Sequence, residues 1–182
     1  LLLPPMRADL GWSYLTAGAM NTVNAAGYLV GALAMPLALR RHGARRLLLA
    51  GGIGAALLLA AHGLVRTDAA LYALRALTGV ASAVTFVAGG LLAARLASQG
   101  EPKAAGLVLG LYYGGTGIGI VVSALLVPSL SARPVAHAWQ AAWIALGAAA
   151  LIATLLTALA TRGPDPAAPA PTPRARFEWR DY

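Results

Sequence analysis

Long apolar runs, separated by short polar connections, dominate the sequence. Five of them have about 20 mostly apolar residues or more, the length that an α-helix needs to cross the hydrocarbon core of a bilayer. These runs cover residues 14–39, 47–65, 69–94, 104–127 and 136–161. Residues 1–6 resemble the end of a further helix. The pattern predicts an all-α integral membrane bundle over residues 1–161, with five complete spans and the end of a first.

Residues 162–182 have a different composition. Prolines interrupt this segment too often for a helix, so it is predicted to be an extended linker or tail. They are Pro164, Pro166, Pro169, Pro171 and Pro173. The chain begins at Leu1, without an initiator Met or a segment typical of a signal peptide. We therefore expect it to be a piece of a longer polypeptide.

The composition supports a membrane location. Hydrophobic residues make up 59% of the chain and charged residues 11%, against about 25% charged residues in a typical soluble domain. The net charge of +8 comes from basic residues between the apolar runs, so it indicates membrane topology and not a nucleic-acid partner. The chain has no cysteine, which excludes disulfides and thiolate metal sites, and no metal site or cofactor is expected.

The basic residues predict the orientation. Ten of the 14 fall on one side of the predicted membrane and three on the other. Because Lys and Arg are retained on the cytoplasmic side, residues 40–46, 95–103 and 162–182 are predicted to be cytoplasmic in a multi-pass protein of the inner membrane. Trp12, Trp139 and Trp143 lie near the opposite side, where they are expected to form an aromatic belt at the interface.

Arg75 is the one charged residue within a predicted span. Every Asp and Glu, and every other Lys and Arg, lies outside the spans. It could extend to the nearby interface, or it could face a water-filled cavity. Helical spacing favours the cavity, because one arc of the helix carries several polar or small residues with it. They are Arg75, Thr78, Gly79, Ser82, Thr85, Phe86 and Gly89.

Two further spans have polar faces. In 14–39, Asn21, Asn24 and Tyr28 share a face and could bond either a solute or neighbouring helices. In 104–127, one face carries glycines and the other carries polar side chains, as in a helix that rocks against a partner or packs in a static bundle. The first face has Gly106, Gly110, Tyr113 and Gly117, with Gly114 at its margin, and the second has Tyr112, Thr116, Gly119 and Ser123.

Neither the two remaining spans nor the histidines indicate a catalytic or binding site. The spans 47–65 and 136–161 are nearly uniform in Ala and Leu and are expected to face lipid. His62 and His137 fall near the outer ends of spans and His42 lies between basic residues, so all three are predicted to be solvated. No Ser-His, His-Asp or metal-ligand combination lies within the spans, so a membrane enzyme is disfavoured.

Three stretches resemble the major facilitator superfamily, specifically its N-terminal six-helix half. The loop LRRHGARR is similar to the superfamily's cytoplasmic signature loop in Arg41, Gly43 and Arg45, with further basic residues at Arg40 and Arg46. Arg40 replaces the usual Asp of that signature and Pro36 its leading Gly. Arg75 and Gly79 match an Arg-x-x-x-Gly pattern often implicated in proton coupling, and the glycine-rich span before Pro128 resembles a third signature. The stretches LLLPPMRADLGWS and YYGGTGIGIVVSALLVP resemble the YbfB/YjiJ-like branch.

The resemblance implies a secondary active transporter that works by alternating access between two halves. The span 69–94 would line the central cavity, and a missing C-terminal six-helix half would be the main protein partner. The solute, the direction of transport and the coupling ion are not indicated. A membrane scaffold or sensor that does not transport is the alternative, and the polar faces of the spans argue against it.

Overall fold

The structure is a computed structural model that describes residues 1–99, 102–132 and 135–162. This part of the chain contains six α-helices. Their bounds are α1 Leu3–Leu10, α2 Tyr14–His42, α3 Ala44–His62, α4 Asp68–Gln99, α5 Pro102–Ser131 and α6 Ala138–Ala160. Nearly the whole predicted tail, 163–182, lies outside the described residues, as do residues 100–101 of the loop predicted to be cytoplasmic.

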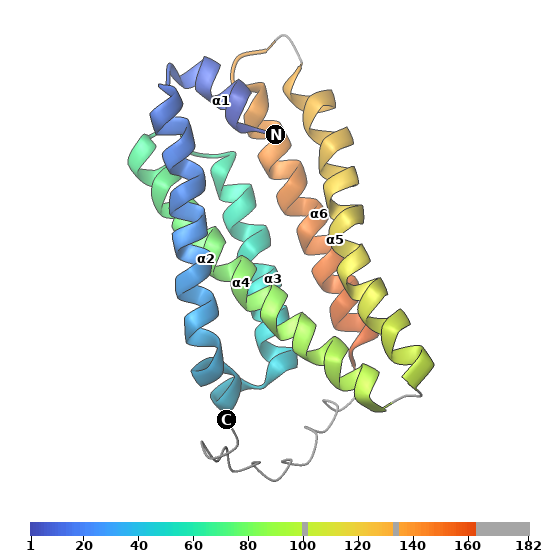
Figure 1. Ribbon diagram of the computed structural model, residues 1–182. Helices are drawn as coiled ribbons and strands as arrows, with labels where there is room; N and C mark the ends of the chain where they lie inside the picture. Colours follow the sequence, from blue (N-terminus) through green and yellow to red (C-terminus); the bar gives the residue numbers. More distant parts are fainter. Residues whose placement is uncertain (100–101, 133–134, 163–182) are drawn as a thin grey trace, which may run out of the picture.

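Five of the helices, α2 to α6, are long and apolar enough to cross a membrane. The predicted fold class, an all-α membrane bundle with five spans, is therefore confirmed. The short α1 lies across one end of the bundle (Figure 1). That end, which holds Asp9, Asp68 and His137, is called the α1 end below.

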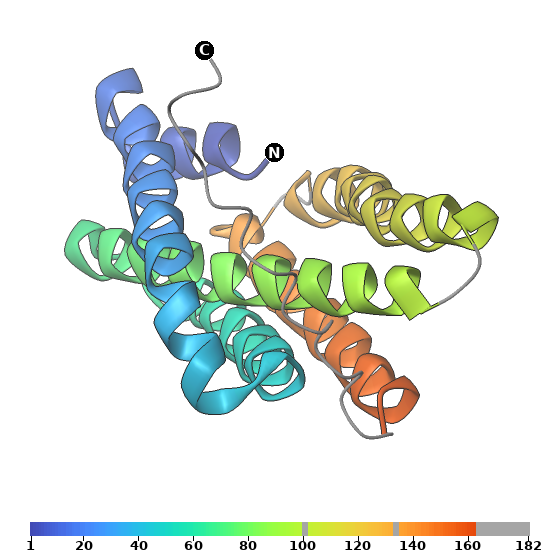
Figure 2. The same cartoon turned by 60° about the horizontal axis from the view of Figure 1, so that its bottom comes forward.

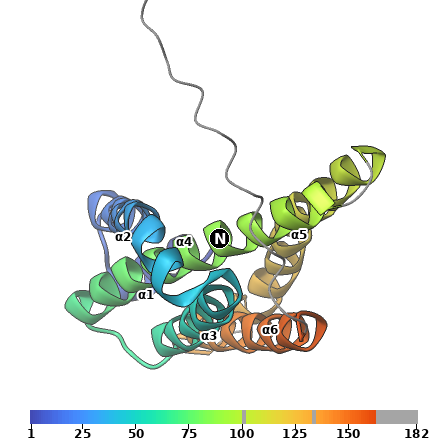
Figure 3. The same ribbon diagram turned by 90° about the horizontal axis from the view of Figure 1, so that it is seen from below.

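α4 is the central helix. It contacts α2, α3 and α5, and α6 contacts α3 and α5. Figure 2 shows α4 running across the middle of the bundle. Viewed from below, α3 and α6 lie side by side along one flank of α4, whereas α2 and α5 lie toward its two ends (Figure 3).

Small residues allow α2 and α4 to approach closely. A Cβ atom at Gly27 would lie 2.0 Å from the Ala76 carbonyl oxygen, and one at Gly79 would lie 2.1 Å from the Asn24 carbonyl oxygen. Both obstacles are backbone atoms of the facing helix, which cannot rotate away as a side chain can. The two glycines therefore set the distance between these helices.

The connection between α2 and α3 is a single residue, Gly43. Its φ of 75° lies in the left-handed region, which glycine adopts without steric cost. Its N–H donates to the Leu39 carbonyl oxygen at 3.1 Å and so closes the last turn of α2. Two residues later, Arg45 Nε donates to the Thr161 carbonyl oxygen at 2.5 Å, which places a cation at the C-terminal end of α6.

Three tryptophans form part of the core at the α1 end, and this differs from the prediction of an aromatic belt. Trp12, Trp139 and Trp143 are 6%, 2% and 4% exposed. They are buried because α1 folds over the ends of the long helices and brings Leu2 and Met6 against them. Each indole N–H has an acceptor within the protein: Asp68 for Trp12, Asp9 for Trp139 and the Met6 sulfur for Trp143.

Candidate functional site

A cavity with a polar lining lies between α2, α4, α5 and α6 near the α1 end. It has a volume of about 270 Å³. Its polar lining comes from Asn21 of α2, Arg75 of α4 and Ser123 of α5. The apolar lining is Leu1, Leu2, Leu3, Val127, Trp143 and Leu146.

Arg75 is held at this cavity by an aromatic ring. Its guanidinium carbon lies 4.8 Å from the centre of the Trp143 ring, within the range of a cation–π contact. The Arg75 side chain is half-buried and Trp143 is buried. Arg75 therefore lines the cavity near the α1 end.

His62 stacks on the same tryptophan. The centres of the two rings are 4.5 Å apart, and their planes differ by 23°. The His62 side chain is 0% exposed, so the prediction of a solvated histidine is wrong for this residue. His62 Nδ1 is 2.7 Å from the Leu58 carbonyl oxygen, while Nε2 has no hydrogen-bond partner within the described chain. The α3–α6 contact buries this ring, and the position of His62 at the end of a span gave no sign of that contact.

The other polar residues predicted for α4 do not join Arg75 in the cavity. Gly79 packs against the backbone of α2, and Thr85 lies against Gly51 of α3. Thr78 is buried, and its hydroxyl has no hydrogen-bond partner among the described residues. Ser82 is half-buried and does not line the cavity. One arc of α4 thus meets several neighbours, because α4 is surrounded on three sides.

A second group of predicted residues lies between α4 and α5, away from the cavity. Tyr112 Oη donates to the Phe86 carbonyl oxygen at 2.6 Å. The Tyr112 ring contacts the rings of Phe86 and Tyr113, with centres 5.9 and 5.1 Å apart. A Cβ atom at Gly89 would lie 3.0 Å from the Tyr112 ring, so this glycine makes room for the tyrosine. These contacts hold α5 against α4.

Two predicted residues of α2 lie at its contact with α4. The Asn24 carbonyl oxygen and the Tyr28 backbone nitrogen face Gly79. Both side chains are half-buried, and neither lines the Arg75 cavity. Of the three polar residues predicted on this face, Asn21 is the one that the structure brings to Arg75.

The glycines of α5 face open space in this structure. A Cβ atom at any of the predicted packing positions would have no neighbour within 4 Å. These positions are Gly106, Gly110, Gly114, Gly117 and Gly119, and Thr116 between them is also exposed. The described chain thus supplies no partner for this face of α5. Ser123, on the other predicted face, lines the Arg75 cavity together with Val127 of the same helix.

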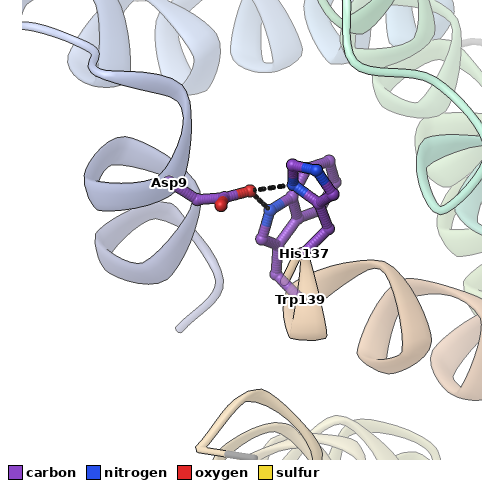
Figure 4. A network of polar contacts seen from close by, with 3 residues as sticks. All are labelled: Asp9, His137 and Trp139. Atoms are coloured by element: carbon purple, nitrogen blue, oxygen red, sulfur yellow. Dashed lines mark hydrogen bonds and ion pairs between the residues drawn. The ribbon is translucent and has the colours of Figure 1, made fainter. Parts of the chain in front are cut away.

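A polar network at the α1 end joins α1 to α6 (Figure 4). His137 Nδ1 and Trp139 Nε1 both donate to the Asp9 Oδ2 atom at 2.5 Å. The Trp139 bond holds the pKa of Asp9 below its ordinary value of 3.8; burial opposes this effect, and His137 and Arg66 add to it. His137 itself has a φ of 57°, which is uncommon for a residue other than glycine. His137 is half-buried, so its ring is partly solvated as well as bonded to Asp9.

The basic residues of the α2–α3 connection do not converge on a site. Arg40, Arg41 and Arg46 are exposed, and Arg45 is half-buried against the end of α6. No group of three or more His, Cys, Asp or Glu side chains that could hold a metal occurs in the described part of the chain.

Comparison with known proteins gives one match. The family model described as "Uncharacterised MFS-type transporter YbfB" matches residues 1–181. This is the superfamily and the branch that the sequence motifs resemble. Searches of curated proteins and of solved structures find no match.

Proposed function

This chain belongs to the family of the MFS-type transporter YbfB, and from this premise we propose that it moves an unidentified small solute across the membrane by alternating access. The cavity beside Arg75 is the proposed solute site. The observation that carries this proposal is a half-buried guanidinium inside a membrane bundle, stacked on Trp143 and beside a cavity of about 270 Å³. Ionised groups in such positions are expensive to bury and commonly mark solute or ion pathways.

The chain is proposed to be the N-terminal half of the transporter. Alternating access in this fold needs two halves that rock around a shared site. The glycine face of α5 supports this proposal, because small residues allow close helix contact and nothing in the described chain covers them. The proposed partner is a C-terminal six-helix half, and reading the gene on both sides of this chain tests for it. A gene product with no further membrane helices would contradict the half-transporter proposal.

The proposed location is the inner membrane, with residues 40–46, 95–103 and 162–182 on the cytoplasmic side. The asymmetric distribution of Lys and Arg supports this orientation. Proton coupling is also proposed, because Arg75 and Gly79 match the pattern associated with it. No other cofactor is proposed.

The function is tested with Arg75 variants of the complete gene product. Uptake and efflux of a solute panel would be measured in vesicles at several pH values. Arg75→Ala should reduce transport by about tenfold or more, because it removes the one charged side chain among the described residues that line the cavity. Arg75→Lys should retain part of the activity, because it keeps the charge but loses the planar guanidinium.

Arg66→Ala is the matched control, because Arg66 is exposed at the same end of the bundle and does not line the cavity. Its transport should equal that of the unchanged protein. Full transport by both Arg75 variants would remove Arg75 from the mechanism. A complete gene product that transports no solute, with or without a proton gradient, would favour the scaffold or sensor alternative.

A further inference from the structure

The charge on Arg75 has no counter-charge within the described chain. The two carboxylates in this part of the sequence are Asp9 and Asp68. Asp9 accepts hydrogen bonds from His137 and Trp139, and Asp68 accepts one from Trp12 at 2.8 Å. Arg75 lies seven residues after Asp68 on α4, which is roughly 10 Å along the helix axis. The Arg75 guanidinium forms no ion pair with either carboxylate.

The position of Arg75 makes this lack of a partner significant. A guanidinium beside a low-dielectric bundle loses hydration and is stabilised by an anion that binds in a planar, two-pronged geometry. The Trp143 ring supports the guanidinium carbon at 4.8 Å and leaves its N–H groups to find acceptors elsewhere. The cavity that Arg75 lines is therefore suited to an acceptor that carries negative charge.

The rest of the cavity complements such a ligand. Asn21 offers an amide that can donate to an anionic oxygen, while the Ser123 hydroxyl donates to the Ile120 carbonyl oxygen at 2.9 Å. Val127, Trp143 and Leu146 form an apolar surface beside these polar groups. The volume of about 270 Å³ is just below the usual range for small-molecule sites, so it suits a small solute.

We propose that the transported solute is a small organic monoanion, whose carboxylate binds Arg75 with support from Asn21 while its apolar part lies against Trp143, Val127 and Leu146. This inference rests on the proposed function, because it names the substrate class of the same cavity. One cation matches one negative charge. A phosphate monoester would bring nearly two charges and leave one unpaired at an otherwise apolar surface.

The experiment compares solutes that differ in charge and share an apolar body. Benzoate, benzamide and benzylamine form one set, and butyrate, butyramide and butylamine form another. Binding to the complete gene product would be measured from thermal stabilisation and from tryptophan fluorescence, and transport from uptake into vesicles. In at least one set the carboxylate should bind at least tenfold more tightly than its amide or amine.

Variants test whether Arg75 is the residue responsible. Arg75→Gln should abolish the preference for the carboxylate over the amide, while Arg75→Lys should keep a reduced preference. Asn21→Ala should weaken carboxylate binding severalfold and leave amide binding nearly unchanged. Arg66→Gln removes a positive charge from the same end of the bundle without touching the cavity, and it should change neither. If Arg75→Gln does not fold, Arg75→Lys and Asn21→Ala supply the same comparison.

An anionic lipid headgroup has the same chemistry, so each measurement would be made in pure phosphatidylcholine and in a mixture with phosphatidylglycerol. Solute preference in both membranes supports the proposal. An Arg75-dependent stabilisation by phosphatidylglycerol, with no carboxylate preferred over its amide, assigns Arg75 to a lipid and overturns it. Arg75-dependent transport of neutral or cationic solutes only would also overturn the proposal while leaving the proposed function intact.

Discussion

At the scale of single residues, Asp9 accepts more side-chain hydrogen bonds than Asp68, the other carboxylate of the described chain. Its Oδ2 atom accepts hydrogen bonds from His137 and Trp139, which lie 128 and 130 residues later in the chain. These two bonds attach α1 to the start of α6. Losing the negative charge of Asp9 should therefore loosen α1 and expose the tryptophans beneath it.

Asp9→Asn is expected to lower the free energy of unfolding by about 1–3 kcal/mol, because a neutral amide accepts these hydrogen bonds less strongly. The lowered pKa of Asp9 adds a pH dependence. Its contribution is complete above the ordinary value of 3.8 and is lost as the pH falls through the lower folded value. Thermal unfolding in detergent between pH 3 and pH 7 would measure both effects.

Ala8→Asn provides the control, because Ala8 is an exposed neighbour on α1 outside the network. It should unfold like the unchanged protein at every pH. Equal melting temperatures for Asp9→Asn and the unchanged protein at neutral pH would contradict a structural role for the network.

Contacts between side chains of different helices could not be predicted from the sequence. Arg75 was predictable as a candidate, because it is the one charged residue in an apolar run. Its neighbours were not: Trp143, His62 and Ser123 reach the same region from three other helices. Their approach depends on how α3, α5 and α6 pack, and helical spacing within one segment contains no information about that packing.

At the scale of the helices, small residues have two different roles. Gly27 and Gly79 lie at the α2–α4 contact, where a Cβ atom would collide with backbone. A Cβ atom added at Gly110 or Gly114 of α5 would meet no atom within 4 Å. The same residue type is thus essential to packing at one interface and uncovered at another.

Substitution by alanine should separate these roles. Gly79→Ala is expected to destabilise the bundle by about 1–3 kcal/mol or more, because its Cβ atom would lie 2.1 Å from the Asn24 carbonyl oxygen. In this chain expressed by itself, the matched variant Gly110→Ala should be neutral or stabilising by up to about 1 kcal/mol, since alanine favours the helix. Melting temperatures in detergent would compare them. A destabilising Gly110→Ala would show that the α5 face is covered.

The number and kind of long helices followed from the apolar runs alone, because a bilayer span requires both length and low polarity. Their ends were less predictable. α4 continues to Gln99 and α5 to Ser131, beyond the predicted 94 and 127. Pro128 lies inside α5, although proline lacks an N–H and usually ends or kinks a helix, so the apolar run alone did not indicate this extension. A single polar face was predicted for α4. This prediction was incomplete, because α4 is central and α2, α3 and α5 each contact part of its surface.

At the scale of the whole molecule, the family and the fold class could be recognised before the structure. The order of the motifs along the chain mattered more than any one motif, because each alone is short and degenerate. The shape of the cavity could not be recognised, because it is formed by side chains from α2, α4, α5 and α6 together. The choice of solute depends on that cavity, so it could not be predicted from the sequence.

The orientation in the membrane can be tested directly because the chain contains no cysteine. Single variants Arg41→Cys and Arg66→Cys would place a thiol at exposed positions at opposite ends of the bundle. A membrane-impermeant maleimide should label Arg66→Cys in intact cells and Arg41→Cys only after permeabilisation. Labelling in the opposite order would reverse the proposed orientation.

The one-residue connection at Gly43 also affects how the protein is made. α2 and α3 are both apolar and are connected by one residue, so α3 is expected to enter the bilayer directly after α2. The arginines on either side of Gly43 would remain at the insertion machinery's side and act as a stop for translocation. An insertion of several residues after Gly43 should therefore affect biogenesis before it affects transport, by allowing α2 to partition into the membrane without α3.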